Sequence, residues 1–271
     1  MRIRLLFLIL LATILSVFTL SGHLLAHDPV ETQSDSTRWI VELPVWVPGY
    51  RGEISWGDID INGGGGDGGI LGKIFDSATK LDYYYVGKVR YSYQKWRFQG
   101  DIYGGQIDNS VNFVLQDGSL IDTKVEATIP RVIVGYRIFD KEFDHKKFGR
   151  LHSYFYGGAR FFNLGILAEL PEPSLPLDLN HTWINPIVGL SLSYYLQRFT
   201  LTSEADIGLI ESLSNPTWWV HLHARYRIHH RFSFALGWTV QNIHRETELL
   251  GHQFRYNVRL SGPMAGLTIH F

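Results

Sequence analysis

The chain has 271 residues, which is enough for one large β domain or two ordinary domains. Its formal net charge of −1 argues against a nucleic-acid partner, because such a partner requires a basic patch or stripe. The absence of cysteine excludes disulfides and thiolate metal sites. Aromatic residues make up 14% of the chain and glycines number 27, a composition that favours β structure with many turns.

Residues 1–26 have the pattern of a secretory signal peptide. Two arginines precede an apolar run from Leu5 to Leu20, and Leu24-Leu25-Ala26 offers a cleavage site. A single transmembrane anchor is the alternative, because the run is nearly long enough to span a bilayer. No later run approaches the roughly 18 apolar residues of a spanning helix, so a mature chain of residues 27–271 would cross a membrane only as a closed barrel.

From Trp39 onward the chain alternates polar and apolar residues with a period of two, which predicts β-strands. The expected strands occupy residues 39–47, 82–93, 96–103, 123–139, 152–161, 184–194, 199–209, 218–228, 232–241 and 258–271. Tight connections at 94–95, 140–149, 197–198 and 229–230 alternate with longer ones at 53–80, 104–121, 167–182, 212–216 and 244–255. This rhythm predicts an all-β fold, a single antiparallel transmembrane β-barrel with both termini in the periplasm. Ten strands are expected, and eight remain the alternative.

One face of the strands is apolar and the other carries charge. The aromatic residues Trp96, Trp218, Trp238, Tyr226 and Phe199 fall near the ends of the apolar face, as in the two aromatic girdles of a membrane barrel. A soluble lipocalin-like barrel alternates in the same way but places its apolar face inside. The signal peptide and the rhythm of short and long connections favour the membrane barrel.

Glycines and prolines mark irregular positions. The run from Asn62 to Gly69 has one copy of a pattern that binds calcium only as stacked copies, so a flexible surface loop is the preferred interpretation. Pro44, Pro48 and Pro130 lack ladder donors, and a lateral opening for apolar solutes would lie where they interrupt the strands.

The inward face is predicted to hold a ladder of charge pairs that fills the lumen. Its members are Glu42, Arg90, Arg97, Asp101, Arg131, Arg137, Arg160, Glu204, Asp206, His221, His223, Arg225 and Arg227. Buried charges are costly unless they are paired, and mutual pairing would satisfy them.

A second hypothesis gives chemistry to part of this row. Strands 199–209 and 218–228 are neighbours, so Asp206 is expected near His221 or His223, and Glu204 near Arg225. A carboxylate beside an imidazole can orient a general base, and two histidines at i and i+2 with a carboxylate can hold a metal. The alternative function is therefore a membrane-embedded hydrolase or acyltransferase at the extracellular rim.

The segment Val258 to Phe271 ends on an apolar face formed by Leu267, Ile269 and Phe271. This terminus resembles the signal that the barrel-assembly machinery recognises in Gram-negative outer-membrane proteins. The resemblance implies that the three side chains form a C-terminal assembly signal.

Five short motifs occur in order in the second half of the chain. They are Gly135-Tyr136-Arg137, Gly157-Gly158-Ala159-Arg160-Phe161, Trp183 to Gly189, Glu204 to Gly208 and Gly262 to Leu267. Together they resemble bacterial outer-membrane proteins related to the small OmpA/OmpW-type β-barrels. The chain departs from that pattern at Asn185, where an acid is expected, and in the 62–69 glycine run. The resemblance implies a barrel in an outer membrane and no particular activity.

The sequence thus predicts a non-enzymatic outer-membrane β-barrel of a Gram-negative bacterium, with a structural or surface role or a narrow passive channel for small or apolar solutes. No cofactor and no catalytic or metal-binding residues are expected. The expected partners are outer-membrane lipid or lipopolysaccharide and, during biogenesis, the barrel-assembly machinery. The sequence does not identify a ligand.

Overall fold

The computed structural model describes residues 38–56, 59–64, 81–108, 113–114, 120–143, 149–169, 177–210, 216–249 and 251–271. The predicted signal peptide and part of the glycine run, 65–69, lie outside the described residues. Every regular element within the described residues is a strand. No helix in this part of the chain is long and apolar enough to cross a membrane.

The strands, in chain order, are β1 (Arg38–Trp46), β2 (Gly49–Trp56), β3 (Ile59–Gly64), β4 (Leu81–Tyr93), β5 (Trp96–Asp108), β6 (Phe113–Val114), β7 (Leu120–Glu142), β8 (Arg150–Glu169), β9 (Leu177–Leu196), β10 (Phe199–Gly208), β11 (Trp218–His229), β12 (Phe232–Leu249) and β13 (His252–His270).

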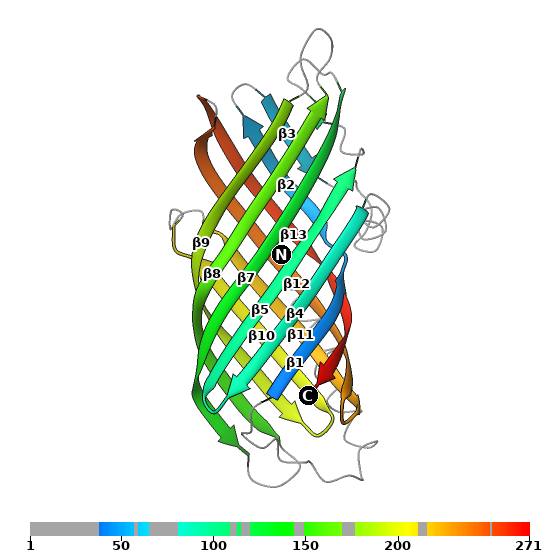
Figure 1. Cartoon of the computed structure of the whole chain (residues 1–271), viewed down its shortest axis with the longest axis vertical. Coiled ribbons are helices and arrows are strands. Elements are labelled where there is room, and N and C mark those ends of the chain that lie inside the picture. The colour runs from blue at the N-terminus through cyan, green and yellow to red at the C-terminus, as the bar shows by residue number, and fades with distance from the viewer. Residues whose placement is uncertain are drawn as a thin grey trace, which may run out of the picture. The chain divides into compact units, whose positions relative to one another are not determined.

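Ten of these strands form a closed antiparallel barrel (Figure 1). The order around the wall is β1-β4-β5-β7-β8-β9-β10-β11-β12-β13, and pairing of β1 with β13 closes the ring. The predicted fold class is confirmed, with ten strands rather than eight. The hairpin of β2 and β3 is not one of the ten strands of this ring. It pairs with β13 beyond the end of β1, and β6 pairs with β7.

Two prolines coincide with short interruptions that leave the strand register unchanged. Pro48 falls between β1 and β2, whose pairs with β13 keep one register, and the Val47 N–H donates to the Pro263 carbonyl at 3.1 Å across the break. Pro130 pairs with β5 but falls outside the ladder with β8. Pro44 pairs with Gly266 of β13, but the ladder between β1 and β4 ends before it, at the pair of Glu42 and Lys88. Since the register continues on both sides of the breaks at Pro48 and Pro130, these two prolines mark local irregularities in joined strands.

One end of the barrel carries the turns at 94–95, 197–198 and 229–231 and is called the short-turn end. Two of its hairpins turn at Gln94 and Gln197, with φ of 53° and 50°. Positive φ matches the strand twist in two-residue hairpin turns. The Phe271 N–H donates to the Trp39 carbonyl at 3.0 Å, so the start of β1 and the end of β13 meet at this same end (Figure 1).

At the opposite end, several segments that the sequence predicts as loops are strands instead. The predicted loop 244–255 is the continuation of β12 and β13, which meet in a turn at Gly251 with φ of +81°. Part of the predicted loop 53–80 is β2 and β3, and β5, β7, β8 and β9 extend into predicted loops 104–121 and 167–182. Strands β7, β8 and β9 have 23, 20 and 20 residues, against about 9–11 that cross a bilayer.

The side-chain polarity inverts along these long strands. In the part next to the short-turn end, called the membrane half, outward side chains such as Leu190 and Leu236 are apolar and exposed, while inward ones are charged and buried. In the part beyond it, called the head, the inward side chains of β8 are Phe162 and Leu164, and outward ones such as Glu246 are polar. The membrane half therefore has the polarity of a lipid-embedded barrel, and the head has that of a soluble sheet.

The core of the head is an apolar cluster enclosed by strands from opposite walls. Its buried members are Ile54, Ile129, Phe162, Leu164, Ile166, Leu179, Trp183, Ile243, Phe254, Tyr256 and Val258. Aromatic contacts join the walls: the Trp183 ring of β9 stacks on Phe162 at 4.7 Å and meets Tyr256 of β13 edge-on at 6.3 Å. The cluster therefore packs side chains of β9 against β13 inside the head, beyond the charged layer of the membrane half.

Candidate functional site

The strand register aligns the charges of the membrane half into a belt around the lumen. Glu42 lies opposite Lys88, Lys88 opposite Asp101, and Asp101 opposite Arg131. Arg131 is in turn opposite Arg160, which faces Asn185. The first four members alternate in sign on adjacent strands, an arrangement in which directly opposed side chains attract.

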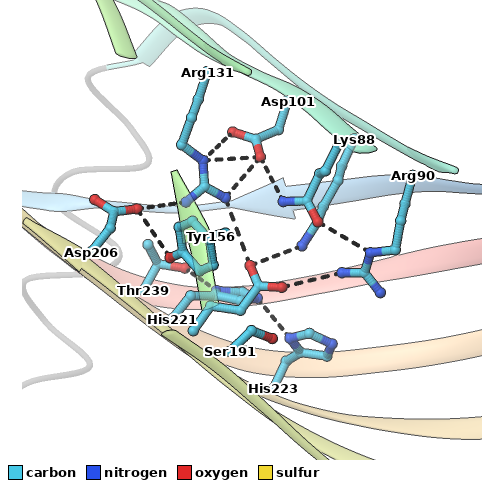
Figure 2. Close-up of polar contacts among 12 residues, drawn as sticks. Lys88, Arg90, Asp101, Arg131, Tyr156, Ser191, Asp206, His221, His223 and Thr239 are labelled. Carbon is cyan, nitrogen blue, oxygen red and sulfur yellow. Dashed lines mark hydrogen bonds and ion pairs between the residues drawn. The ribbon is translucent and has the colours of Figure 1, made fainter. Parts of the chain in front are cut away.

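Arg131 is the most connected member of the belt (Figure 2). Its Nε and Nη2 donate to the two carboxylate oxygens of Asp101 at 3.0 and 2.8 Å, and its Nη1 donates to Asp206 at 2.8 Å. The guanidinium carbon lies 4.0 Å from the centre of the Trp219 ring. Arg131 is 2% exposed, so these charge-assisted bonds replace its hydration almost completely.

Two carboxylates of β10 reach across the lumen to the belt. Asp206 accepts from Arg160 at 2.6 Å and from the Tyr156 hydroxyl at 3.3 Å, besides its bond to Arg131. Glu204 lies 3.2 Å from Arg90 and 3.4 Å from Lys88. Because β10 is not adjacent to β4, β5 or β7, these bonds tie separate parts of the wall together.

A second branch of the network joins β1 to β11. Arg225 donates to Glu42, and its Nη2 lies 3.4 Å from Nε2 of His223. His223 and His221 are linked through Nδ1 and Nε2 at 2.8 Å, and His221 bonds the Thr239 hydroxyl at 2.7 Å (Figure 2). The two imidazoles are thus members of a buried hydrogen-bonded chain.

The lumen charge network holds more cations than anions. Four carboxylates, Glu42, Asp101, Glu204 and Asp206, face six cations, Lys88, Arg90, Arg97, Arg131, Arg160 and Arg225, all buried. Arg97 illustrates how the excess is accommodated, because its guanidinium lies over the Tyr154 ring at 3.6 Å and donates to Ser191 at 3.1 Å. Its Nη1 also lies 3.9 Å from Glu204, and the cation–π contact and the neutral acceptor supplement this long ion pair.

Glycine makes room for large side chains in the lumen. A Cβ atom added to Gly189 would lie 2.6 Å from the Tyr156 hydroxyl oxygen, so the tyrosine that bonds Asp206 occupies the space of a missing side chain. Any larger residue at Gly189 would displace Tyr156 from its bond.

Two predicted members of the network lie elsewhere. Arg137 is at the short-turn end, where it pairs with Asp140 at 3.0 Å and donates to the Gln94 carbonyl. Arg150 donates to the same carboxylate, and this hydrogen bond lowers the pKa of Asp140. Arg227 is half-buried where the register between β11 and β12 shifts.

Lys88 belongs to the network although the sequence-based set of site residues omits it. The signal for it was present, because Lys88 falls on the same inward row of β4 as Arg90. Gln99, Tyr156, Ser191 and Thr239 are further polar members that charge alone does not indicate.

The sequence predicts Asp206 beside His221 or His223 and Glu204 beside Arg225, but the printed bonds of both carboxylates go to other residues. Glu204 does lie opposite His221 in the ladder, but its ion pairs go to Lys88 and Arg90. Asp206 lies opposite Trp219, and the partner of Arg225 is Glu42 rather than Glu204. Both carboxylates instead pair with cations of strands that are distant in sequence, and local sequence spacing does not predict such pairs. In the described ranges no group of three histidine, aspartate or glutamate side chains could hold a metal ion.

The proposed C-terminal signal residues lie on the outer surface. Leu267 and Phe271 are 53% and 71% exposed, and Ile269 shares their face of β13. Their role in assembly remains a prediction.

Comparisons with known proteins give only distant likenesses. No protein-family model matches the chain, and no curated protein matches it in sequence. Among solved structures, Neisserial surface protein A aligns with a TM-score of 0.33 at 10% identity, covering 87% of this chain and 99% of that one. The P. putida toluene transporter TodX gives 0.30 at 7% identity over 90% and 92%, and a Pseudomonas aeruginosa FadL homologue gives 0.31 at 9% over 87% and 89%. At these scores the barrel assignment rests on the strand pairing and polarity of this chain itself.

Proposed function

We propose that the protein is a non-enzymatic outer-membrane β-barrel of a Gram-negative bacterium that holds a folded β head at the cell surface above a closed lumen. The observation that carries this proposal is the filling of the lumen in two layers. A hydrogen-bonded charge network occupies the membrane half, and an apolar cluster closes the head. A narrow barrel of this size can be filled by its own side chains.

The proposed orientation places the short-turn end in the periplasm and the head outside. Short periplasmic turns and longer extracellular segments are the usual arrangement of such barrels. Export by the segment 1–26 and insertion by the barrel-assembly machinery through Leu267, Ile269 and Phe271 belong to the same proposal. A relationship to the small OmpA/OmpW-type barrels belongs to the same proposal and implies no particular activity.

The test is single-channel conductance of the purified, refolded full-length protein in planar bilayers. Because both layers are packed, we expect no discrete openings from protein whose heat-modifiable gel migration shows a folded barrel. A conducting porin refolded in the same way is the positive control. Reproducible openings of the wild-type barrel would contradict a closed lumen and support the narrow passive channel. The excess of cations in the lumen then predicts anion selectivity.

The hydrolase or acyltransferase alternative has a separate test. His221 bonds Thr239, the two histidines bond each other, and His223 lies beside Arg225, so within the described residues no carboxylate orients either histidine through a direct bond. We expect His221→Ala and His223→Ala to leave lipid A and outer-membrane peptides unchanged relative to wild type. A product formed by wild type and lost in either variant would establish the enzyme.

A further inference from the structure

A row of outward side chains crosses four strands where the membrane half meets the head. Trp218 of β11 lies opposite Asn242 of β12, Asn242 opposite Arg259 of β13, and Arg259 opposite Arg51 of β2. The row faces away from the lumen, because Val258 and Tyr256, the alternate residues of β13, are buried in the head core.

The row places two exposed arginines directly opposite one another. Like charges at opposed positions of an antiparallel pair repel. Within the described part of the chain, no carboxylate forms an ion pair with Arg51 or Arg259. Glu53, two residues further along β2, lies opposite Asn257 instead. By contrast, Arg255 on the same face of β13 is bonded to Glu246 at 3.0 Å. Among the described residues, these two adjacent guanidiniums therefore have no carboxylate within ion-pair distance.

The two arginines lie near aromatic residues of the outer face, where the membrane half meets the head. The guanidinium carbon of Arg259 is 5.5 Å from the centre of the Trp218 ring. Trp238, a neighbouring aromatic of the outer face, donates to Ser261, two residues from Arg259. Tryptophans with a bonded polar end are typical of the membrane interface, where lipid headgroups lie.

We propose that Arg51 and Arg259 form a binding site for a phosphate group of lipid A, the phosphorylated glycolipid anchor of lipopolysaccharide in the outer leaflet. A guanidinium pair presents parallel N–H donors that fit phosphate oxygens, and one phosphate offsets the repulsion between the two cations. The proposal rests on the orientation proposed above, which sets this end of the barrel in the outer leaflet.

The test measures lipid bound to the full-length barrel in detergent by native mass spectrometry. The probes are lipid A, dephosphorylated lipid A, phosphatidylglycerol and inorganic phosphate. We expect the variant Arg51→Gln/Arg259→Gln to bind lipid A about tenfold or more weakly than wild type, as expected from the loss of charge-assisted bonds. Arg255→Gln is the control, and Arg259→Gln alone is its match in charge, because each removes one positive charge from the same face of β13, where Glu246 already pairs with Arg255.

The outcomes separate this site from the proposed function. Wild-type preference for lipid A over its dephosphorylated form, lost in the double variant and kept in Arg255→Gln, supports the site. Equal binding by wild type and the double variant overturns it, as does an equal loss in Arg255→Gln, which would indicate diffuse surface charge. Equal affinity for phosphatidylglycerol or inorganic phosphate overturns the assignment to lipid A. None of these results depends on whether the lumen conducts, and gel migration confirms folding of each variant.

Discussion

The membrane half and the head use the same strands with opposite polarity. Along β8, the inward row runs from Tyr154, Tyr156 and Arg160 to Phe162, Leu164 and Ile166 without a change of register. Along β9, the outward row changes from Leu190 and Ile184 to Thr182 and Asn180. The apolar face of one continuous sheet is therefore the outer one in the membrane half and the inner one in the head.

Alternation along a strand and the polarity of each face are therefore determined separately. Alternation with a period of two specifies a strand, whereas the solvent on each side decides which row must be apolar. The interiors differ accordingly. The membrane half depends on geometrically specific ion pairs in a place where unpaired charge is costly, and the head depends on non-directional burial of apolar area.

Removing the centre of the charge network should have the largest effect. Arg131→Ala would leave Asp101 and Asp206 buried, each without its bonds to the guanidinium. Breaking one partner of a buried pair costs about 3–5 kcal/mol, and we expect a loss of this size in the free energy of unfolding measured with urea in lipid vesicles.

The control for Arg131→Ala is Arg255→Ala in the head. Arg255 and its partner Glu246 have side chains that are 49% and 57% exposed, so the change should cost about 1 kcal/mol or less. Comparable losses in the two variants would contradict the view that the network is a buried structural unit.

The sequence predicted the membrane half far better than the head. The inward parity of Arg131 and Glu204, and the outward parity of Leu190, followed from alternation alone. The partners did not, because Glu204 meets Lys88 and Arg90 across the lumen, and that proximity depends on barrel closure. The sequence predicts loops for much of the head, because the outward row there is polar, which is the reverse of a lipid-facing strand.

Truncation in the head core should have the next largest effect. Leu164→Ala removes a side chain that is 3% exposed and lies in the apolar cluster. We expect a loss of about 3 kcal/mol, detected as faster protease cleavage of the head while the membrane half stays protected. The matched control is Leu167→Ala, on the same strand but 41% exposed, which should cost about 0.5 kcal/mol. Equal protease sensitivity of the two variants would mean that the cluster is not a core.

The smallest of the three effects tests the boundary of the two halves on one strand. Leu190→Arg places a charge on the lipid face of β9, where the leucine is 53% exposed, and should cost about 2 kcal/mol in the free energy of folding into vesicles. Asn180→Arg, on the same outward row in the head, should cost about 0.5 kcal/mol or less, because this position faces water. If Asn180→Arg is as costly as Leu190→Arg, the head lies in the bilayer and the inversion of polarity does not mark the membrane boundary. If neither is costly, the outer face of β9 does not contact lipid at all.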